Sequence, residues 1–351
     1  MKNTLYRLSL SIIIVATLCC CDEDNYYGNW AYKSVMNDIG RANSAVFTID
    51  DNIYMVGGEG YYLIHKNFNS TWCYCPNGNY WNEMDSLPCS PRSEGVAFAI
   101  DGKGYFCGGH NIDNEYFDEL FEFDPSKPEG SQWRLLESDP FPGGPFFGGI
   151  GFAANGFGYV GTGYYIENGY SKDYYKFDAT KPEGSRWSKI DASSASKRLD
   201  ANVFVIDDKA YILGGRHNGA KVNSMECLDA STDKIYVISN DMLKDYNVDI
   251  LYRYNASSFS IGGKGYITCG LKFTGEVLRD TWEYTPDVNK GKGSWQVMGD
   301  FEGPSRYGAP ACSVGKYGYI LCGQNGAGSS SFKDDVWKFC PTEKYNRRYY
   351  K

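Results

Sequence analysis

The sequence predicts an all-β fold, a six-bladed β-propeller, and three observations support this. A Tyr shortly before a Gly pair recurs six times along the chain, at steps of 51, 53, 53, 55 and 53 residues. A fixed period of this size indicates stacked supersecondary units. Most copies follow a pair of Asp, Asn or Gly residues, which suits a two-residue hairpin turn. Two more short runs rich in aromatic residues follow each copy, so each unit has the four strands of a propeller blade.

The elements of each unit come in the same order. The Tyr and Gly motifs, expected as second strands, lie at 54–58, 105–109, 159–163, 211–215, 266–270 and 319–323. The expected third strands lie at 72–74, 121–123, 175–177, 226–228, 282–284 and 337–339. The expected fourth strands are marked by Trp81, Trp133, Trp187, Ile235 and Trp295. The turn before two of them is nearly duplicated, at 127–133 and 181–187.

The sixth unit stops after its third strand, and the missing strand is expected at the other end of the chain. Trp30 precedes Arg41 by 11 residues, as Trp81 precedes Arg92. We therefore expect residues 30–35 to complete the sixth blade. Closing the ring in this way removes exposed sheet edges.

Residues 1–20 are predicted to be a signal peptide, because Lys2 and Arg7 precede an apolar run too short to span a membrane. Residues 18–21 resemble a bacterial lipobox, which implies lipid attachment at Cys21 in an outer-membrane lipoprotein of the cell envelope. A soluble secreted protein is the alternative. The acidic run 22–24 resembles the surface-export signal of lipoproteins in Bacteroides-like bacteria, and equally suits a solvated tether. The expected divisions are signal peptide 1–20, acidic tether 21–29, propeller 30–345 and tail 346–351.

Charge and cysteine usage exclude several function classes. The whole chain has a formal net charge of −8, and loss of Lys2 and Arg7 with the signal peptide leaves −10, so nucleic-acid binding is not expected. No CxxC motif is present, and the Asp pairs are explained as turn formers, so we expect neither metal nor cofactor. Cys107, Cys269 and Cys322 occupy strand positions and are expected to be buried thiols. The expected state is a monomer that contacts the membrane only through its lipid.

The repeated Gly pair, the Tyr before it, the later Trp and the Arg that opens each unit resemble Kelch repeats over residues 30–341. The third unit departs from the pattern with Gly161-Thr162-Gly163, and the fifth and sixth units have Cys-Gly in place of Gly-Gly. Kelch propellers serve unrelated functions, so the resemblance predicts the fold rather than the activity.

An arginine lies 16 residues before the first Gly or Cys of the pair in all units but the third, which has Pro145. These residues are Arg41, Arg92, Arg198, Arg253 and Arg306. By resemblance to Kelch propellers, they would ring one mouth of the central channel. Two interpretations stay open: each arginine pairs with a carboxylate or carbonyl and holds the blades together, or the ring binds an anionic ligand in bidentate fashion.

The resemblance also places the loops after the Gly pairs at this mouth. They offer candidate ligand-binding residues: Glu59, Tyr61, His110, Asn111, Tyr164, Tyr165, Arg216, His217, Gln324 and Asn325. Aromatic faces beside amides and carboxylates suit sugar recognition. Tyr is equally an ordinary filler of a half-buried sheet surface.

The resulting expectation is a lipid-anchored propeller that binds a glycan or an envelope protein at the channel mouth. The alternative is a sugar mutarotase or epimerase similar to N-acetylneuraminate epimerase, with Glu94 or Asp200 as the catalytic residue that abstracts a proton or assists opening of the sugar ring. The two can be distinguished, because salt bridges from Arg92 to Glu94 and from Arg198 to Asp200 would weaken the enzyme hypothesis.

Overall fold

A computed structural model describes residues 26–239, 252–287 and 293–345. The predicted signal peptide, Cys21 and the acidic run 22–24 lie outside the described residues. Within the described ranges the chain has no α-helix, and a single 3₁₀ turn occurs at Ser329–Ser331. No helix in this part of the chain is long and apolar enough to cross a membrane.

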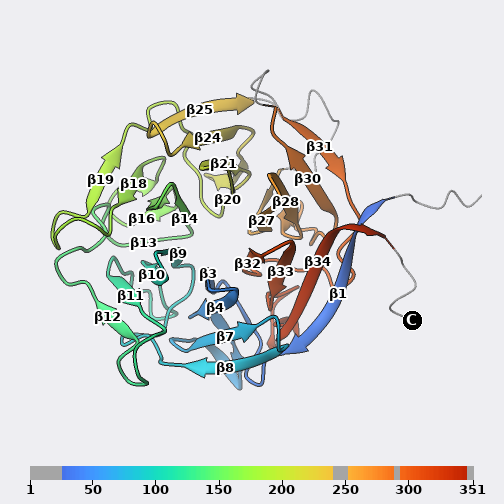
Figure 1. Cartoon of the computed structure of the whole chain (residues 1–351), viewed down its shortest axis with the longest axis horizontal. Helices are drawn as coiled ribbons and strands as arrows, with labels where there is room; N and C mark the ends of the chain where they lie inside the picture. Colours follow the sequence, from blue (N-terminus) through green and yellow to red (C-terminus); the bar gives the residue numbers. More distant parts are fainter. Residues whose placement is uncertain (1–25, 240–251, 288–292, 346–351) are drawn as a thin grey trace, which may run out of the picture.

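The described residues form six antiparallel four-stranded sheets arranged around a central axis (Figure 1). The first three sheets contain β3 (Ala45–Ile49), β4 (Asn52–Val56), β7 (Thr71–Cys75) and β8 (Tyr80–Met84); β9 (Val96–Ile100), β10 (Lys103–Cys107), β11 (Leu120–Phe123) and β12 (Trp133–Leu135); and β14 (Ile150–Ala154), β15 (Phe157–Gly161), β18 (Tyr174–Phe177) and β19 (Trp187–Ile190). The other three contain β20 (Asn202–Ile206), β21 (Lys209–Leu213), β24 (Met225–Asp229) and β25 (Lys234–Ser239); β27 (Ser257–Ile261), β28 (Lys264–Thr268), β30 (Thr281–Thr285) and β31 (Ser294–Val297); and β32 (Ala311–Val314), β33 (Tyr317–Leu321), β34 (Asp335–Lys344) and β1 (Tyr27–Val35). The predicted all-β propeller is confirmed.

Short strands join the blades at one end of the ring. They are β2 (Arg41–Ala42), β5 (Glu59–Tyr62), β6 (Ile64–Asn67), β13 (Phe146–Phe147), β16 (Tyr164–Tyr165), β17 (Gly169–Tyr170), β22 (Arg216–His217), β23 (Ala220–Lys221), β26 (Arg253–Tyr254) and β29 (Leu271–Lys272). These strands pair in small sheets of two or three, separate from the blades. They contain Arg41, Arg253 and several of the residues that follow the Gly pairs, so the candidate site lies among them and the loops between them.

The innermost hairpin of each blade follows from its turn residues. Asp50 and Asp51 have φ of 48° and 63°, and Asp207 and Asp208 have 48° and 59°. Asp and Asn tolerate this left-handed conformation, which the favoured two-residue hairpin requires at both positions. The turns therefore set the register in which Phe47 lies opposite Tyr54 and stacks on it, with ring centroids 5.4 Å apart.

The sixth blade is closed by the N-terminal strand, as predicted. β1 pairs antiparallel with β34, with Trp30 opposite Phe339 and Tyr32 opposite Trp337. Trp30 is 1% exposed and packs against Phe301 and Phe339 in the core between the fifth and sixth blades. The two ends of the described chain are thereby held in one sheet.

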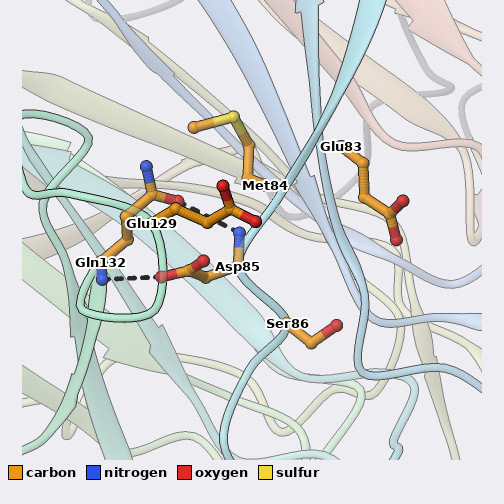
Figure 2. Close-up of a pocket in the computed structure, with 6 residues that line it drawn as sticks. All are labelled: Glu83, Met84, Asp85, Ser86, Glu129 and Gln132. Carbon is orange, nitrogen blue, oxygen red and sulfur yellow. Dashed lines mark hydrogen bonds between the residues drawn. The ribbon is translucent and has the colours of Figure 1, made fainter.

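At the outer edge of the ring, a carboxylate of one blade accepts hydrogen bonds from the backbone of a turn in the next blade, and this contact links the two blades. The Asp85 carboxylate accepts a hydrogen bond from the backbone N–H of Gln132 at 2.9 Å, and Asp85 N–H donates to Gln132 Oε1 (Figure 2). The same carboxylate accepts a hydrogen bond from the backbone N–H of Gly130 at 2.8 Å. Asp139 accepts from Gly184 in the same way at 2.9 Å. The near-duplicated turns therefore serve contacts between blades, and the outer pocket beside Asp85 is part of one such contact.

The Gly pair is a pair of left-handed residues whose first member need not be glycine. First members have φ between 57° and 73°, and second members between 82° and 99°. In the third blade the pair is Thr162-Gly163, with φ of 57° and 90°. The strand pairing Ile150↔Gly161 matches Ala45↔Val56, so Gly161 corresponds to Val56. This corrects the sequence alignment of the third unit by one residue, because the backbone conformation and not the first glycine defines the repeat.

Candidate functional site

The repeated arginines lie inside the blades. Arg41, Arg92, Arg198, Arg253 and Arg306 are all 0% or 1% exposed. Each forms an ion pair with a carboxylate: Arg41 with Asp38, Arg92 with Glu119, Arg198 with Glu226, Arg253 with Asp280 and Arg306 with Asp335. Most also donate to the carbonyl 16 residues later, as Arg198 does to Gly214 O at 3.0 Å.

These arginines therefore hold the blades, the first of the two interpretations left open by the sequence. The expectation that they ring an open mouth differs from the structure, because a guanidinium that is fully buried and ion-paired presents nothing to a ligand. Phe146, and not Pro145, takes the arginine position in the third blade. Its carbonyl accepts from Gly109 N–H as the carbonyl of Arg198 accepts from Gly163 N–H.

A closed ring of backbone hydrogen bonds surrounds the axis two residues after the arginines. In the described chain, each N–H of this channel ring donates to the carbonyl of the preceding blade's ring residue, over 2.7–3.1 Å. The channel ring consists of Asn43, Glu94, Gly148, Asp200, Asn255 and Gly308. All its residues are left-handed, with φ of 54° to 61°. Such a conformation costs a non-glycine residue about 1–2 kcal/mol, so the blade packing imposes it.

A second set of residues lies beside the channel ring. In every blade the residue before the ring residue pairs with the residue that directly follows the Gly pair. This mouth set consists of Glu59, His110, Tyr164, Arg216, Leu271 and Gln324. All of these but Leu271 were candidate binding residues from the sequence.

Three members of the mouth set contact the ring residue of their own blade. Glu59 accepts a 2.7 Å hydrogen bond from Asn43 Nδ2. His110 Nε2 lies 3.6 Å from Glu94 Oε2. Arg216 Nε donates to Asp200 Oδ2 at 2.8 Å. The catalytic candidates Glu94 and Asp200 are therefore not locked by Arg92 and Arg198, which pair with other carboxylates.

Burial and the neighbouring carboxylate raise the proton affinity of Asp200. Burial, and then the charge of Glu94, raise the pKa of Asp200 to about 7, although Arg216 and His110 oppose the shift. Burial lowers the pKa of His110, but its hydrogen bond to Glu94 and the charge of Glu94 outweigh burial and raise it overall. The ring thus holds a carboxyl group that exchanges its proton near neutral pH, beside a histidine.

The opposite side of the channel ring has amides in place of carboxylates. Asn255 Nδ2 donates to Asn43 Oδ1 at 3.2 Å, and Gly308 lies between them in the ring. Glu94 and Asp200 flank Gly148 in the same order. A Cβ atom at Gly148 would lie 2.8 Å from Asp200 Oδ1, and one at Gly308 would lie 2.4 Å from Asn43 Oδ1. The glycines therefore make room for the side chains that lean over them.

The remaining candidates from the sequence divide into buried and accessible groups. Tyr165 is 2% exposed in the core beside Phe141 and Phe146. Asn111 is buried and closes its own loop through Glu115, and Gln324 is buried. Those three side chains are therefore structural. By contrast, Tyr61, Tyr164 and His217 are half-buried, and Asn325 is exposed.

Sequence reasoning missed aromatic residues that directly precede the ring residues. Tyr254 and Tyr307 follow Arg253 and Arg306, and both are half-buried. The guanidinium of Arg216 lies 5.2 Å from the Tyr254 ring centroid. Burial and then the charge of Glu59 raise the pKa of Tyr307, which places it near the same cluster. Their position one residue after the repeated arginine was the available signal.

Comparisons with known proteins agree with this fold. The Kelch motif family model matches residues 40–88. A solved structure described as that of YjhT superimposes with a TM-score of 0.65, at 16% sequence identity, over 87% of this chain and 96% of that one. The chain therefore has a β-propeller fold, with a Kelch motif at residues 40–88.

One curated relative also matches part of this chain. N-acetylneuraminate epimerase of Shigella sonnei (strain Ss046) is 37% identical over 78 residues. The match spans 21% of this chain and 21% of that protein, so the chain matches about a fifth of the relative's length.

Proposed function

We propose that this Kelch propeller is a sugar mutarotase or epimerase whose reaction takes place at the channel ring. The observation that carries the proposal is the pair Glu94 and Asp200, held on neighbouring side-chain-bearing positions of the ring and not neutralised by the blade arginines. An efficient acid–base catalyst has a pKa near the working pH, and the pKa of Asp200 is raised to about 7. The partial match to N-acetylneuraminate epimerase supports the same class of chemistry.

The residues suggest a mechanism by ring opening. Neutral Asp200 would donate its proton to the sugar ring oxygen while ionised Glu94 accepts the proton of the anomeric hydroxyl. The bond between the anomeric carbon and the ring oxygen breaks, which leaves an open-chain carbonyl and a hydroxyl. Rotation of the carbonyl and closure with the reverse proton transfers give the other anomer, and both carboxyl groups regain their starting states.

Binding without turnover is the second candidate, and the aromatic side chains at the mouth favour it. Tyr164, Tyr254 and Tyr307 are half-buried beside polar groups, and such faces stack on sugar rings. The exposed Leu63 and Ile64 of the β5–β6 hairpin would suit an envelope protein as the ligand instead.

Proton NMR of anomer exchange tests the proposal. We expect the full-length protein to accelerate exchange in N-acetylneuraminate or D-glucuronate. Glu94→Gln and Asp200→Asn should each slow catalysed exchange by about 10²–10⁴-fold, since each removes a proton-transfer group. Glu129→Gln, which changes an exposed carboxylate at the outer edge, is the matched control. Binding that perturbs sugar resonances without faster exchange would favour the binding module, and unchanged exchange in both ring variants would contradict the proposed site.

We also propose that the mature chain begins at an acylated Cys21 in the outer membrane, with its propeller in the cell envelope. The lipobox-like residues 18–21 and the acidic run after them support this. Mass spectrometry of the N-terminal peptide from membrane fractions tests it, and an unmodified Cys21 would contradict it.

A further inference from the structure

Arg216 differs from the blade arginines in that part of its guanidinium is open to solvent. Its side chain is 40% exposed, and only Nε donates to Asp200. Within the described residues its two terminal nitrogens make no hydrogen bond, so the fork that binds carboxylates in bidentate fashion stays available. Its guanidinium also lies over Tyr254, which limits its orientations.

The positive charge of Arg216 also disfavours protonation of Asp200. Burial raises the pKa of Asp200 first and the charge of Glu94 second, whereas the charge and hydrogen bond of Arg216 lower it. The Asp200 side chain is only 4% exposed, so solvent screens these charges weakly. Any anion that binds to Arg216 adds negative charge beside Asp200 and offsets the effect of this arginine.

Resting on the proposed function, we propose that Arg216 binds the carboxylate of an acidic sugar and that this binding is coupled to proton uptake by the Glu94–Asp200 pair. The proton comes from solvent and adds to a carboxylate oxygen of the pair, and no other bond changes. Binding of the acidic sugar would thereby favour the protonated form of Asp200, which the ring-opening step requires as its proton donor. A neutral sugar at the same place would leave the pair less protonated.

The amide side of the channel ring supports a proton shared between Glu94 and Asp200. Asn43 and Asn255 flank Gly308 and form a 3.2 Å hydrogen bond, in which Asn255 Nδ2–H donates to Asn43 Oδ1. Glu94 and Asp200 flank Gly148 in the same way, but two ionised carboxylates have no hydrogen to share. One added proton would give the two carboxylates a hydrogen to share and would reduce their repulsion.

The charged groups that face this pair come from three blades. His110 beside Glu94 belongs to the second blade, and Arg216 beside Asp200 to the fourth. Glu59 of the first blade also acts on the pKa of His110. Arg216 is the one of these that contacts Asp200 directly, at 2.8 Å, so its neutralisation has the largest effect on that carboxyl group.

Isothermal titration calorimetry in buffers of different ionisation enthalpy tests the coupling. The probes are N-acetylneuraminate and its methyl ester, which lacks the charge, with D-glucuronate and D-glucose as a second matched pair. We expect the acids to bind with uptake of a fraction of a proton near pH 7. Their affinity should fall by up to about tenfold per pH unit above the pKa of Asp200, as one linked proton requires. The neutral partners should bind without uptake.

Two variants separate the steps. Asp200→Asn, a residue that Asn43 and Asn255 already provide at the same left-handed positions, should bind the acids without proton uptake. Arg216→Gln should lose the preference for the acid over its neutral partner. Acid binding without uptake in the wild type, or failure of both acids to bind, would overturn the inference. Uptake without anomer exchange would leave it standing and reject only the proposed catalysis.

Discussion

Arginines in two regions of this propeller differ in burial and in the partners they bind. Arg198, inside the fourth blade, is fully buried and pairs with Glu226, which is also fully buried. Arg216, 18 residues later at the mouth of the same blade, is 40% exposed and donates to Asp200 through one nitrogen. The arginine that recurs with the repeat supports the fold, and the arginine that does not recur is the one left for chemistry. In a repeat protein, departure from the repeat is therefore the better guide to a site.

The largest expected effect comes from breaking the buried ion pair between Arg198 and Glu226. Arg198→Met leaves the Glu226 carboxylate buried without its cation, which should cost about 3–5 kcal/mol of unfolding free energy. Arg216→Gln should cost less, because the guanidinium is 40% exposed and Asp200, whose pKa is already raised to about 7, can take up a proton when the cation is lost. Urea unfolding of both variants at one pH measures the difference. Equal losses would show that the two arginines do not differ in structural role.

Removing both buried partners sharpens the same point. In the double variant Arg198→Met/Glu226→Leu no charge is left unpaired, so the free energy of unfolding should return to within about 2 kcal/mol of the wild type. The single Arg198→Met variant is the control. A double variant as unstable as the single one would mean that the packing of Arg198, and not its charge, holds the blade.

Titration of Asp200 at the mouth should contribute to the pH dependence of the free energy of unfolding. The pKa of Asp200 is raised from 3.8 to about 7 in the folded protein. The folded state therefore binds more protons than the unfolded chain between about pH 4 and pH 7, and stability falls as pH rises through that window. Asp200→Asn should flatten this fall. The difference in Tm between variant and wild type, measured from pH 4 to pH 8, isolates the contribution of Asp200, and a constant difference would contradict the shift.

The smallest expected effect concerns the histidine beside the pair. The pKa of His110 is raised because the Glu94 interactions outweigh burial. Glu94→Gln should therefore lower the pKa of His110, with little change in stability. An NMR titration of the imidazole resonances measures this, with the exposed Glu129→Gln as control. If the pKa of His110 does not change in this variant, the proposed interaction between His110 and Glu94 would be contradicted.

Much of the fold was predictable because each unit repeats local rules. Asp and Gly pairs select the hairpin, alternation of residues gives the strands, and the spacing from Trp30 to Arg41 revealed the closing strand. The third unit was misaligned by one residue. Threonine at 162 takes the left-handed conformation although its β-branched side chain disfavours it, so residue type alone favoured the glycine before it.

The sequence by itself determined the propeller, its closure and the fourteen to sixteen residues that separate each arginine and ring residue from its Gly pair, because these depend on short-range backbone geometry that recurs in every unit. Only the tertiary structure decided which polar side chains are buried in ion pairs and which stay accessible to a ligand. Burial and pairing depend on neighbours from other blades: the pKa of Asp200 is raised first by burial and then by Glu94 of the second blade, across Gly148 of the third. Those contacts form only once the ring has closed around its axis, and so no single repeat could reveal them.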